Sequence, residues 1–414
     1  MAATVVQRHP LPVIRNKVGV FSVVVIASIF YMIAFPKGGI KFGGIPLTIG
    51  YVLTALLAVL TLFRGNGFAL AIDRLLVFLS CLILAGWSYI VIHINGSEYV
   101  SATISYFVAV LYLPAFGMIV FSSNLLDDHY ENVEKTFLWA VRFIVAYGIF
   151  LFVFKQLTGR WIEIPYVTVN AADVGQLDDK FIRRGIFFKL ISTYNNGNIF
   201  GLCVAMMAPL YFQIERSKIM RSMLYLALFL TLSRTSWIGM ALIFAMQSIS
   251  KGVKPSTIMY ILIAGLVSFI AFSFAATAMG RDTSFLWDRN LGGRIDQLQI
   301  LSDMRIIPDE PFTFLPEIAY LGVIKFFGIP GLILFVFYLA ISPMLLWLEG
   351  VRLFNVGPTS ACMQGLLIYM IMACADAAFL LIPVMMVFWM IAGMGFWYAH
   401  RQAWLEGRAH AAVN

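Results

Sequence analysis

The chain has 414 residues, of which 61% are hydrophobic and 12% are charged. A soluble domain has about 45–50% apolar and about 25% charged residues, and a folded sphere cannot hide such an apolar excess in its interior. The composition therefore excludes a soluble globular protein and predicts one that lies in a lipid bilayer. The net charge is +8, but the basic residues form no polybasic tail, so we expect no nucleic-acid partner.

Cysteine and histidine are used sparingly. The five histidines are scattered singly, and the cysteines lie in apolar runs without CxxC spacing, at Cys81, Cys203, Cys362 and Cys374. These patterns predict neither a disulfide framework nor a metal centre, and we expect no cofactor. The first apolar run continues to Phe35 without a signal-peptidase site, so we expect it to be retained as a membrane helix.

Apolar runs of roughly the 20 residues that a bilayer-spanning helix needs recur along the chain. Ten of them lie near residues 18–35, 45–63, 75–93, 102–121, 137–155, 195–213, 257–278, 331–347, 360–375 and 381–399. Two shorter runs, 222–232 and 236–249, flank the polar break Ser233-Arg234-Thr235. We therefore expect an all-α polytopic integral membrane protein with about twelve transmembrane helices, or eleven if the short pair is one broken span. Residues 1–414 would form a single transmembrane domain.

Lysine and arginine are enriched in the cytoplasmic loops of membrane proteins. With the N-terminus inside, the short outer loops hold only Lys37, Lys41 and Arg234. The inner segments hold a larger basic set, namely Arg8, Arg15, Lys17, Arg64, Arg74, Lys135, Arg216, Lys218, Arg221, Lys251, Lys254, Arg352, Arg401 and Arg408. This asymmetry predicts that both termini are cytoplasmic.

Two long loops, 156–194 and 279–317, are then placed on the outer side. Loops longer than about 12–15 residues are usually functional or disordered, and the aromatic content of these two favours folded lids. Their arginines are Arg160, Arg183, Arg184, Arg281, Arg289, Arg294 and Arg305. Because the guanidinium fork binds phosphate in a bidentate manner, the set suits a phosphate at headgroup level. The alternative is that these arginines pair with loop carboxylates or with lipid headgroups.

Arg234 interrupts an apolar stretch, where a charge costs roughly 2.5–3.5 kcal/mol on membrane-insertion scales. Ser233 and Thr235 add hydroxyl donors, and a helix N-terminus follows, so these three residues predict an anion site. The alternative is an interfacial arginine whose head reaches the headgroup region.

Pro316 and Glu317 precede another apolar run. Proline is favoured at the first helical position and a carboxylate beside it interacts well with the helix dipole, so the pair predicts a helix start. That structural reason alone is sufficient for Glu317. Among the other charges near apolar runs, we expect Arg142 to extend its head to the interface, and Lys325 and Asp376 to form buried pairs.

An ordered set of motifs lies between about residues 180 and 345. These are Asn196 and Asn198, Ser233-Arg234-Thr235, Gly293-Arg294, Glu317 and Gly328-Ile329-Pro330-Gly331. The set resembles the bacterial O-antigen polymerase and ligase superfamily, which contains the Wzy-type polysaccharide polymerases and the WaaL-type ligases. In that pattern an asparagine-containing stretch enters one helix, Ser-Arg-Thr ends a short helix, and Gly-Arg lies in the next periplasmic loop. A polar residue then opens a helix that ends in a Gly-Ile-x-Gly turn.

The resemblance implies a GT-C-like glycosyltransferase of the bacterial inner membrane that acts on the periplasmic face. Donor and acceptor would be undecaprenyl-diphosphate-linked oligosaccharides, and the product would be O-antigen, capsule or exopolysaccharide. Membrane lipids and a chain-length regulator would be partners. The ligase branch has a histidine where the helix after the second loop begins, whereas this chain has Glu317 there and no histidine in either long loop. This difference favours a polymerase over an O-antigen ligase.

The resemblance maps the family's essential arginines onto Arg234 and Arg294. Arginines can stabilise the leaving diphosphate without a metal, and Glu317 is the predicted general base, with Asp309 and Glu310 as reserve choices. The family implies a single displacement that inverts the anomeric carbon. The predicted substrate-binding residues are Arg183, Arg184, Arg289, Asn196, Asn198, Ser233 and Thr235.

Two other functions stay open. A secondary transporter or flippase for a polar solute would suit the same helix number, but it would carry its charges near the bilayer midplane rather than in the outer loops. A non-catalytic assembly subunit would not depend on any loop arginine.

Overall fold

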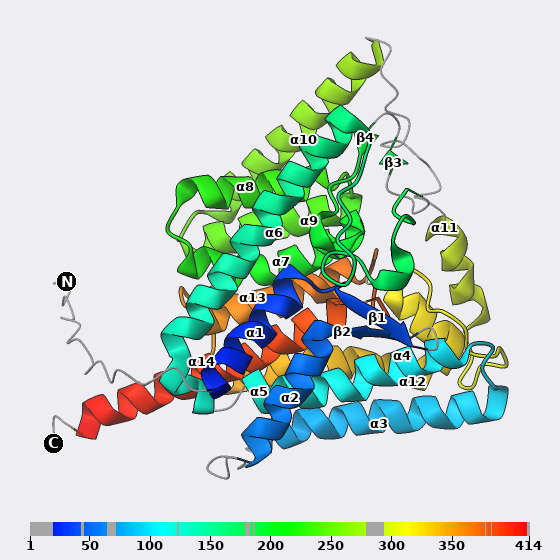
Figure 1. Ribbon diagram of the computed structural model, residues 1–414, viewed down its shortest axis with the longest axis vertical. Coiled ribbons are helices and arrows are strands. Elements are labelled where there is room, and N and C mark those ends of the chain that lie inside the picture. The colour runs from blue at the N-terminus through cyan, green and yellow to red at the C-terminus, as the bar shows by residue number, and fades with distance from the viewer. Residues whose placement is uncertain are drawn as a thin grey trace.

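A computed structural model describes residues 20–42, 45–63, 72–121, 124–178, 183–184, 187–278, 294–376, 378–381 and 383–411. In this part of the chain, helices dominate and strands form only two short antiparallel hairpins (Figure 1). The first hairpin pairs β1 (Gly39–Phe42) with β2 (Ile45–Thr48). The second pairs β3 (Arg183–Arg184) with β4 (Phe187–Phe188) inside the first long loop.

The α-helices are α1 (Val20–Ala34), α2 (Ile49–Phe63), α3 (Ile72–Asn95), α4 (Val100–Phe107), α5 (Leu113–Phe121), α6 (Tyr130–Thr158), α7 (Gly197–Ile214), α8 (Lys218–Leu230), α9 (Arg234–Ser250), α10 (Pro255–Ala278), α11 (Arg294–Gln297), α12 (Ala319–Leu348), α13 (Pro358–Met372) and α14 (Val384–Ala411). Shorter helical segments are η1 (Val108–Tyr112), η2 (Asn124–His129), η3 (Ala171–Asp173), η4 (Ser192–Tyr194) and η6 (Leu298–Asp303). Each apolar run of the sequence coincides with a helix, and the run 102–121 continues through α4, η1 and α5.

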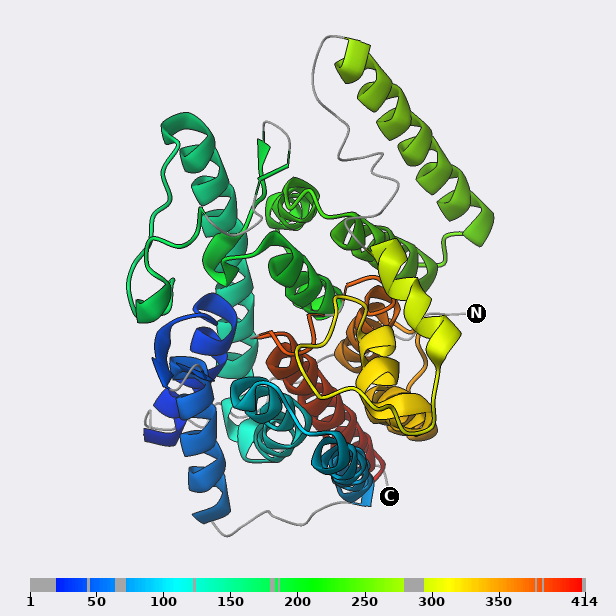
Figure 2. The same ribbon diagram turned by 90° about the vertical axis from the view of Figure 1, so that its right-hand side faces the viewer.

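Four helices within the described ranges, α3, α6, α7 and α12, are long and apolar enough to cross a membrane. Other helices expose large apolar side chains, such as Tyr260, Ile261 and Leu266 on α10, which projects from the bundle (Figures 1 and 2). An outward apolar surface of this extent suits lipid chains and not water. The chain is therefore a helical membrane protein.

Helix α7 lies at the centre of the fold. Apart from Asn198, every residue from Gly197 to Phe212 is buried, and the helix packs against α13, α9 and α14 (Figure 2). The approach of α9 is close, because a methyl group on Gly201 would overlap the Ser236 hydroxyl. The N-termini of α7 and α9 are consequently held side by side.

Several connections between helices meet at one end of the bundle, on the right of Figure 1. Gly39 of the first hairpin forms a β-bridge with Asn170 of the first long loop, and Ser97 forms one with Phe312 of the second. Both long loops are thereby tied to the same end as β1 and β2.

Another set of contacts lies at the opposite end of the bundle, where α14 ends (left of Figure 1). There the Trp397 indole donates to Asp127 at 2.7 Å, and the Tyr398 hydroxyl bonds with Glu134 at 3.0 Å. Polar contacts are thus found at two opposite ends of the bundle within the described residues.

Helix α12 is kinked at Gly328, whose φ of 69° and ψ of −171° are not helical. The second long loop packs at the kink, where Ile329 N–H donates to the Arg305 carbonyl at 3.0 Å. The Trp87 indole of α3 donates to the Phe327 carbonyl at 2.8 Å. The expected helix end at the Gly-Ile-x-Gly motif is thus confirmed: the first helical segment of α12 ends at Gly328, and a second segment follows it after the kink.

The expected helix start at Pro316 is wrong, because α12 begins at Ala319. The preceding residues have tertiary partners instead: Ile318 N–H donates to the Gln297 side chain at 3.3 Å, and Glu317 pairs with Arg294. These partners hold the chain in a non-helical conformation for two residues beyond the proline.

Two other charged residues have specific partners. The Nε and Nη2 of Arg142 donate to the two carboxylate oxygens of buried Glu215 at 2.6 and 2.8 Å. The extension of this side chain to the membrane interface stays a prediction. The expected burial of Lys325 is wrong. Lys325 pairs with Glu310 at 2.9 Å, but the Lys325 side chain is 36% exposed and the Glu310 side chain 54%, so that pair is not buried.

Candidate functional site

The entrance to α7 is fixed by its own asparagines. Asn195 adopts a left-handed conformation with φ of 58°, and its side chain donates to the Thr168 carbonyl at 3.1 Å. Asn196 is the N-cap, and its side-chain oxygen accepts from the backbone N–H of Asn198 and Ile199 at 2.8 and 3.3 Å. Asn196 thus performs helix capping, while the Asn198 side chain points to other residues.

Asn198 lies in a chain of polar contacts. Its Nδ2 donates to Asp376 Oδ2 at 2.6 Å, and its Oδ1 accepts from the Lys189 ammonium at 3.4 Å. Lys189 is itself buried, in the loop segment whose next residue, Leu190, donates its N–H to the Leu230 carbonyl at the end of α8. The first turn of α7 therefore links a buried cation to a buried carboxylate.

The Ser-Arg-Thr motif lies beside this turn. Leu232 adopts a positive φ of 50°, and Ser233 then becomes the N-cap of α9 without a side-chain cap bond. Arg234 is the first residue of α9 and is half-buried, whereas Ser233 and Thr235 are buried. Arg234 thus lies at a helix N-terminus, where the helix dipole also favours a negative ligand.

Arg294 joins the second long loop to this site. Its Nη2 lies 2.8 Å from Glu317 Oε2 and 3.1 Å from Asp376 Oδ2. The arginine side chain is 13% exposed, the Glu317 side chain 51% and the Asp376 side chain 5%. One guanidinium is therefore held between an outer and an inner carboxylate.

Asp376 is a functional candidate that the motif comparison did not include, although the sequence predicted its buried pairing, which the contact with Arg294 confirms. Burial is the main cause that raises its pKa to about 6; Glu317 acts in the same direction, while Arg294, Lys189 and the Asn198 bond act in the opposite direction. A carboxylate between two apolar runs, 360–375 and 381–399, was the available signal.

The remaining predicted site residues fall into two groups. Arg183 and Arg184 form strand β3, but only their backbone is described, and Arg289 lies outside the described residues. The reserve bases are engaged elsewhere, since Asp309 binds Arg305 at 2.5 Å and Glu310 binds Lys325. The structure thus brings together Asn198, Arg294 and Glu317 of the predicted set, in one network with Asp376.

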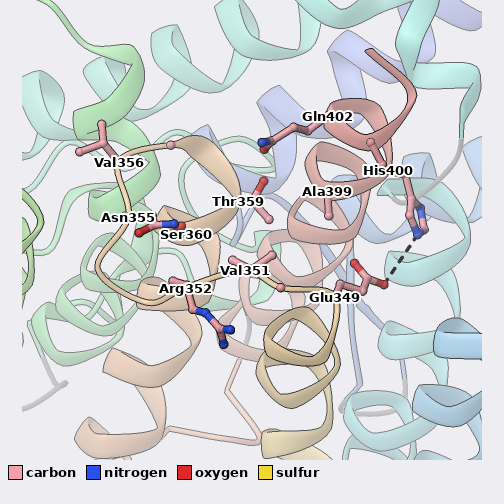
Figure 3. A pocket seen from close by; sticks show the side chains of 13 residues that line it. Glu349, Val351, Arg352, Asn355, Val356, Thr359, Ser360, Ala399, His400 and Gln402 are labelled. Atoms are coloured by element: carbon pink, nitrogen blue, oxygen red, sulfur yellow. Dashed lines mark ion pairs between the residues drawn. The ribbon is translucent and has the colours of Figure 1, made fainter. Parts of the chain in front are cut away.

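A second polar cluster lies at the opposite end of the bundle. A cavity of about 550 Å³ is lined there by the 349–357 loop, the start of α13 and the end of α14 (Figure 3). Glu349 and His400 meet on one side of it at 3.8 Å, and Asp73 lies 3.7 Å from the same imidazole nitrogen. Burial and the charge of Asp73 raise the pKa of Glu349 to about 7.

This second cluster is poorly suited to a metal ion. Its three ligand atoms lie within 4.8 Å of one another, but Arg74 Nη2 lies 3.1 Å from His400 Nδ1. A metal-bound histidine normally donates its other N–H to an acceptor, whereas here a guanidinium donor occupies that position and adds a positive charge. The cluster is better described as a group of polar side chains in which the His400 ring accepts from Arg74.

Comparisons of the chain with protein-family models, with curated proteins and with solved structures gave no match. The helices define the chain as a helical membrane protein, and the network around Arg294 carries the groups that could act chemically. That network offers cations and helix N-termini for an anion, together with two carboxylates that can accept a proton.

Proposed function

We propose that the chain is a membrane glycosyltransferase that polymerises undecaprenyl-diphosphate-linked oligosaccharide repeat units into a surface polysaccharide. The observation that carries the proposal is the contact of Arg294 with both Glu317 and Asp376, at the end of the bundle that holds the two long loops. Glycosyl transfer from a lipid diphosphate needs a cation at the leaving group and a carboxylate at the attacking hydroxyl. This network contains both.

The proposed topology has twelve spans, with both termini in the cytoplasm of a bacterium and both long loops in the periplasm. The described connections support it, because they lie at two opposite ends of the bundle. The hairpin at β1 and β2 shares one end with both long loops, while Glu349 and His400 meet at the other end. The lysine and arginine asymmetry of the sequence favours the loop-bearing end as the outer one.

In the proposed mechanism, Arg234 and Arg294 bind the diphosphate of the donor. Ser233, Thr235 and Asn198 line the approach, and Arg183, Arg184 and Arg289 of the long loops contribute further positive charge. A carboxylate beside Arg294, for which the sequence indicates Glu317, takes the proton of the acceptor hydroxyl. That oxygen attacks the anomeric carbon and inverts it, and the lipid diphosphate leaves.

The alternatives are supported less well. A transporter would need uncompensated charges on a path through the membrane, whereas Arg142 is paired with Glu215 in a bidentate contact away from the loops. A ligase of the related branch would need a histidine at the position of Glu317. The arginine and carboxylate network supports group transfer at one face.

The proposal is tested in membranes that contain the lipid-linked repeat unit, with polymer length measured on gels. Arg234→Lys and Arg294→Lys keep the charge but lose the planar fork, so we expect both to lose polymer nearly as fully as alanine variants. Arg305→Lys is the matched control, because Arg305 is an exposed arginine of the same loop that pairs with Asp303 and Asp309. Full polymerisation by both site variants would refute the donor assignment, and no polymer from the wild type would refute the function.

A further inference from the structure

Two carboxylates contact Arg294, and their surroundings differ. Glu317 lies just before α12 with half of its side chain exposed, so water competes with any substrate for its oxygens. The Asp376 side chain is 5% exposed and lies in the turn between α13 and α14. A proton acceptor is more effective where water is excluded and the acceptor is held still.

The turn fixes Asp376 through its backbone. The N–H groups of Ala375 and Asp376 both donate to the Met372 carbonyl at 2.9 Å. Ala378, two residues later, adopts a left-handed φ of 44°. The two backbone hydrogen bonds hold Asp376 in the turn that follows α13.

The hydrogen bonds of Asp376 use only one of its oxygens. Asn198 Nδ2 and Arg294 Nη2 both donate to Oδ2, at 2.6 and 3.1 Å. Within the described residues, Oδ1 receives no hydrogen bond, so its lone pairs are available to another donor. The side chain is thus oriented through one oxygen and presents the other.

We propose that Asp376, and not Glu317, is the general base that accepts the proton of the acceptor sugar hydroxyl; this rests on the proposed function. As the proton passes to Oδ1, the hydroxyl oxygen forms a bond to the anomeric carbon of the donor. The bond from that carbon to the diphosphate oxygen breaks, and the lipid diphosphate leaves with the electron pair beside Arg294. Asp376 then releases the proton to water.

The electrostatic surroundings suit this role. A general base works best with a pKa near the operating pH, and burial raises the pKa of Asp376 to about 6, so the carboxylate is ionised at neutral pH and yet basic. The charged groups that act on it are Arg294 and Lys189, which lower the pKa, and Glu317, which raises it. Glu317 therefore serves as a positioning residue that holds Arg294 from the solvent side.

The first test compares Asp376→Asn with Glu317→Gln at matched protein levels in the polymer assay. Asp376→Asn keeps the size and an oxygen for both donors, so we expect donor binding to persist while turnover falls by about 10²–10⁴-fold. Glu317→Gln should keep a larger share of the wild-type rate. The inference is overturned if Asp376→Asn polymerises at the wild-type rate, or if Glu317→Gln alone abolishes turnover.

The second test is a pH profile, which decides the matter even where Asp376→Asn fails to fold. The wild-type rate should fall about tenfold per pH unit below about pH 6, because a protonated base cannot accept. Removing the Glu317 charge lowers the pKa of Asp376, so Glu317→Gln should move this acidic limb to lower pH. Loss of the limb in Glu317→Gln would assign it to Glu317 instead. A wild type without polymerase activity would reject the proposed function itself.

Discussion

Arg142 and Glu215 show how a single ion pair is maintained in this protein. Glu215 is fully buried where α7 ends, and it accepts from Arg142, from the Tyr211 hydroxyl at 2.9 Å and from Ser217 N–H at 2.7 Å. These bonds, that of Arg142 above all, lower the pKa of Glu215 to about 2. The Glu215 carboxylate is therefore ionised at every physiological pH, and the Arg142 guanidinium stabilises this buried negative charge.

We predict that Arg142→Leu destabilises the protein by about 3–5 kcal/mol, because it leaves a buried carboxylate without its counter-charge. The measurement is thermal unfolding of the detergent-solubilised protein, followed by fluorescence-detected gel filtration. Lys135→Leu is the matched control on the same helix: its pair with Glu131 is exposed on both sides and should contribute only about 0.3–0.5 kcal/mol. Equal melting temperatures for the two variants would contradict the prediction.

At the scale of an element, α12 depends on one glycine. Gly328 has a positive φ, and an added Cβ would overlap the carbonyl oxygen of Ile306 in the second long loop. A left-handed conformation costs an L-residue roughly 1–2 kcal/mol, to which this steric overlap is added. The bend and the docking of the loop are therefore one feature, and both place Arg294 and Glu317 near Asp376.

We predict that Gly328→Ala displaces the second loop and reduces polymer formation together with thermal stability. Gly252→Ala separates strain from overlap, because Gly252 also has a positive φ of 78° but has open space around its Cβ position. The control should lose only the conformational cost and keep its activity. If both variants behave alike in the melting and polymer assays, the loop does not rely on the kink.

The same helix shows where local patterns fail. Pro316 and Glu317 have the residue types of a helix start, yet α12 begins at Ala319. Helix-start signals describe only local preferences, and here Arg294 and Gln297 offer Glu317 and Ile318 better partners than a first helical turn. The Ser-Arg-Thr break, in contrast, was predicted well, because a polar triplet between two apolar runs has a local cause.

For the whole molecule, the placement of the loops gives a topology prediction. Reporter fusions after Asn170 and Asp303 should report the periplasm, and a fusion after Lys218 should report the cytoplasm, because basic residues favour the cytoplasmic side. The measurement is a pair of compartment-specific reporters at each position. A cytoplasmic signal from either long loop would move the Arg294 network to the other face and would contradict the proposed function.

Composition and run length were enough to predict a helical membrane protein and the approximate positions of its helices. Both act locally, since a segment of about 20 apolar residues favours a helix in lipid whatever segments surround it. It also identified Arg234, Arg294 and Glu317 as candidates through their motif order. These inferences needed no knowledge of which helices touch.

Which charged side chains meet is visible only in the folded arrangement. Arg294 and Asp376 are separated by 82 residues, and Asn198 and Asp376 by 178, so no spacing in the sequence could join them. A buried charge needs a counter-charge within hydrogen-bond reach in the folded state, because only such a partner offsets the free-energy cost of removing the charge from water. Asp309 and Glu310, plausible bases by position in the loop, form exposed pairs with Arg305 and Lys325, whereas the buried carboxylate of Asp376 lies beside Arg294.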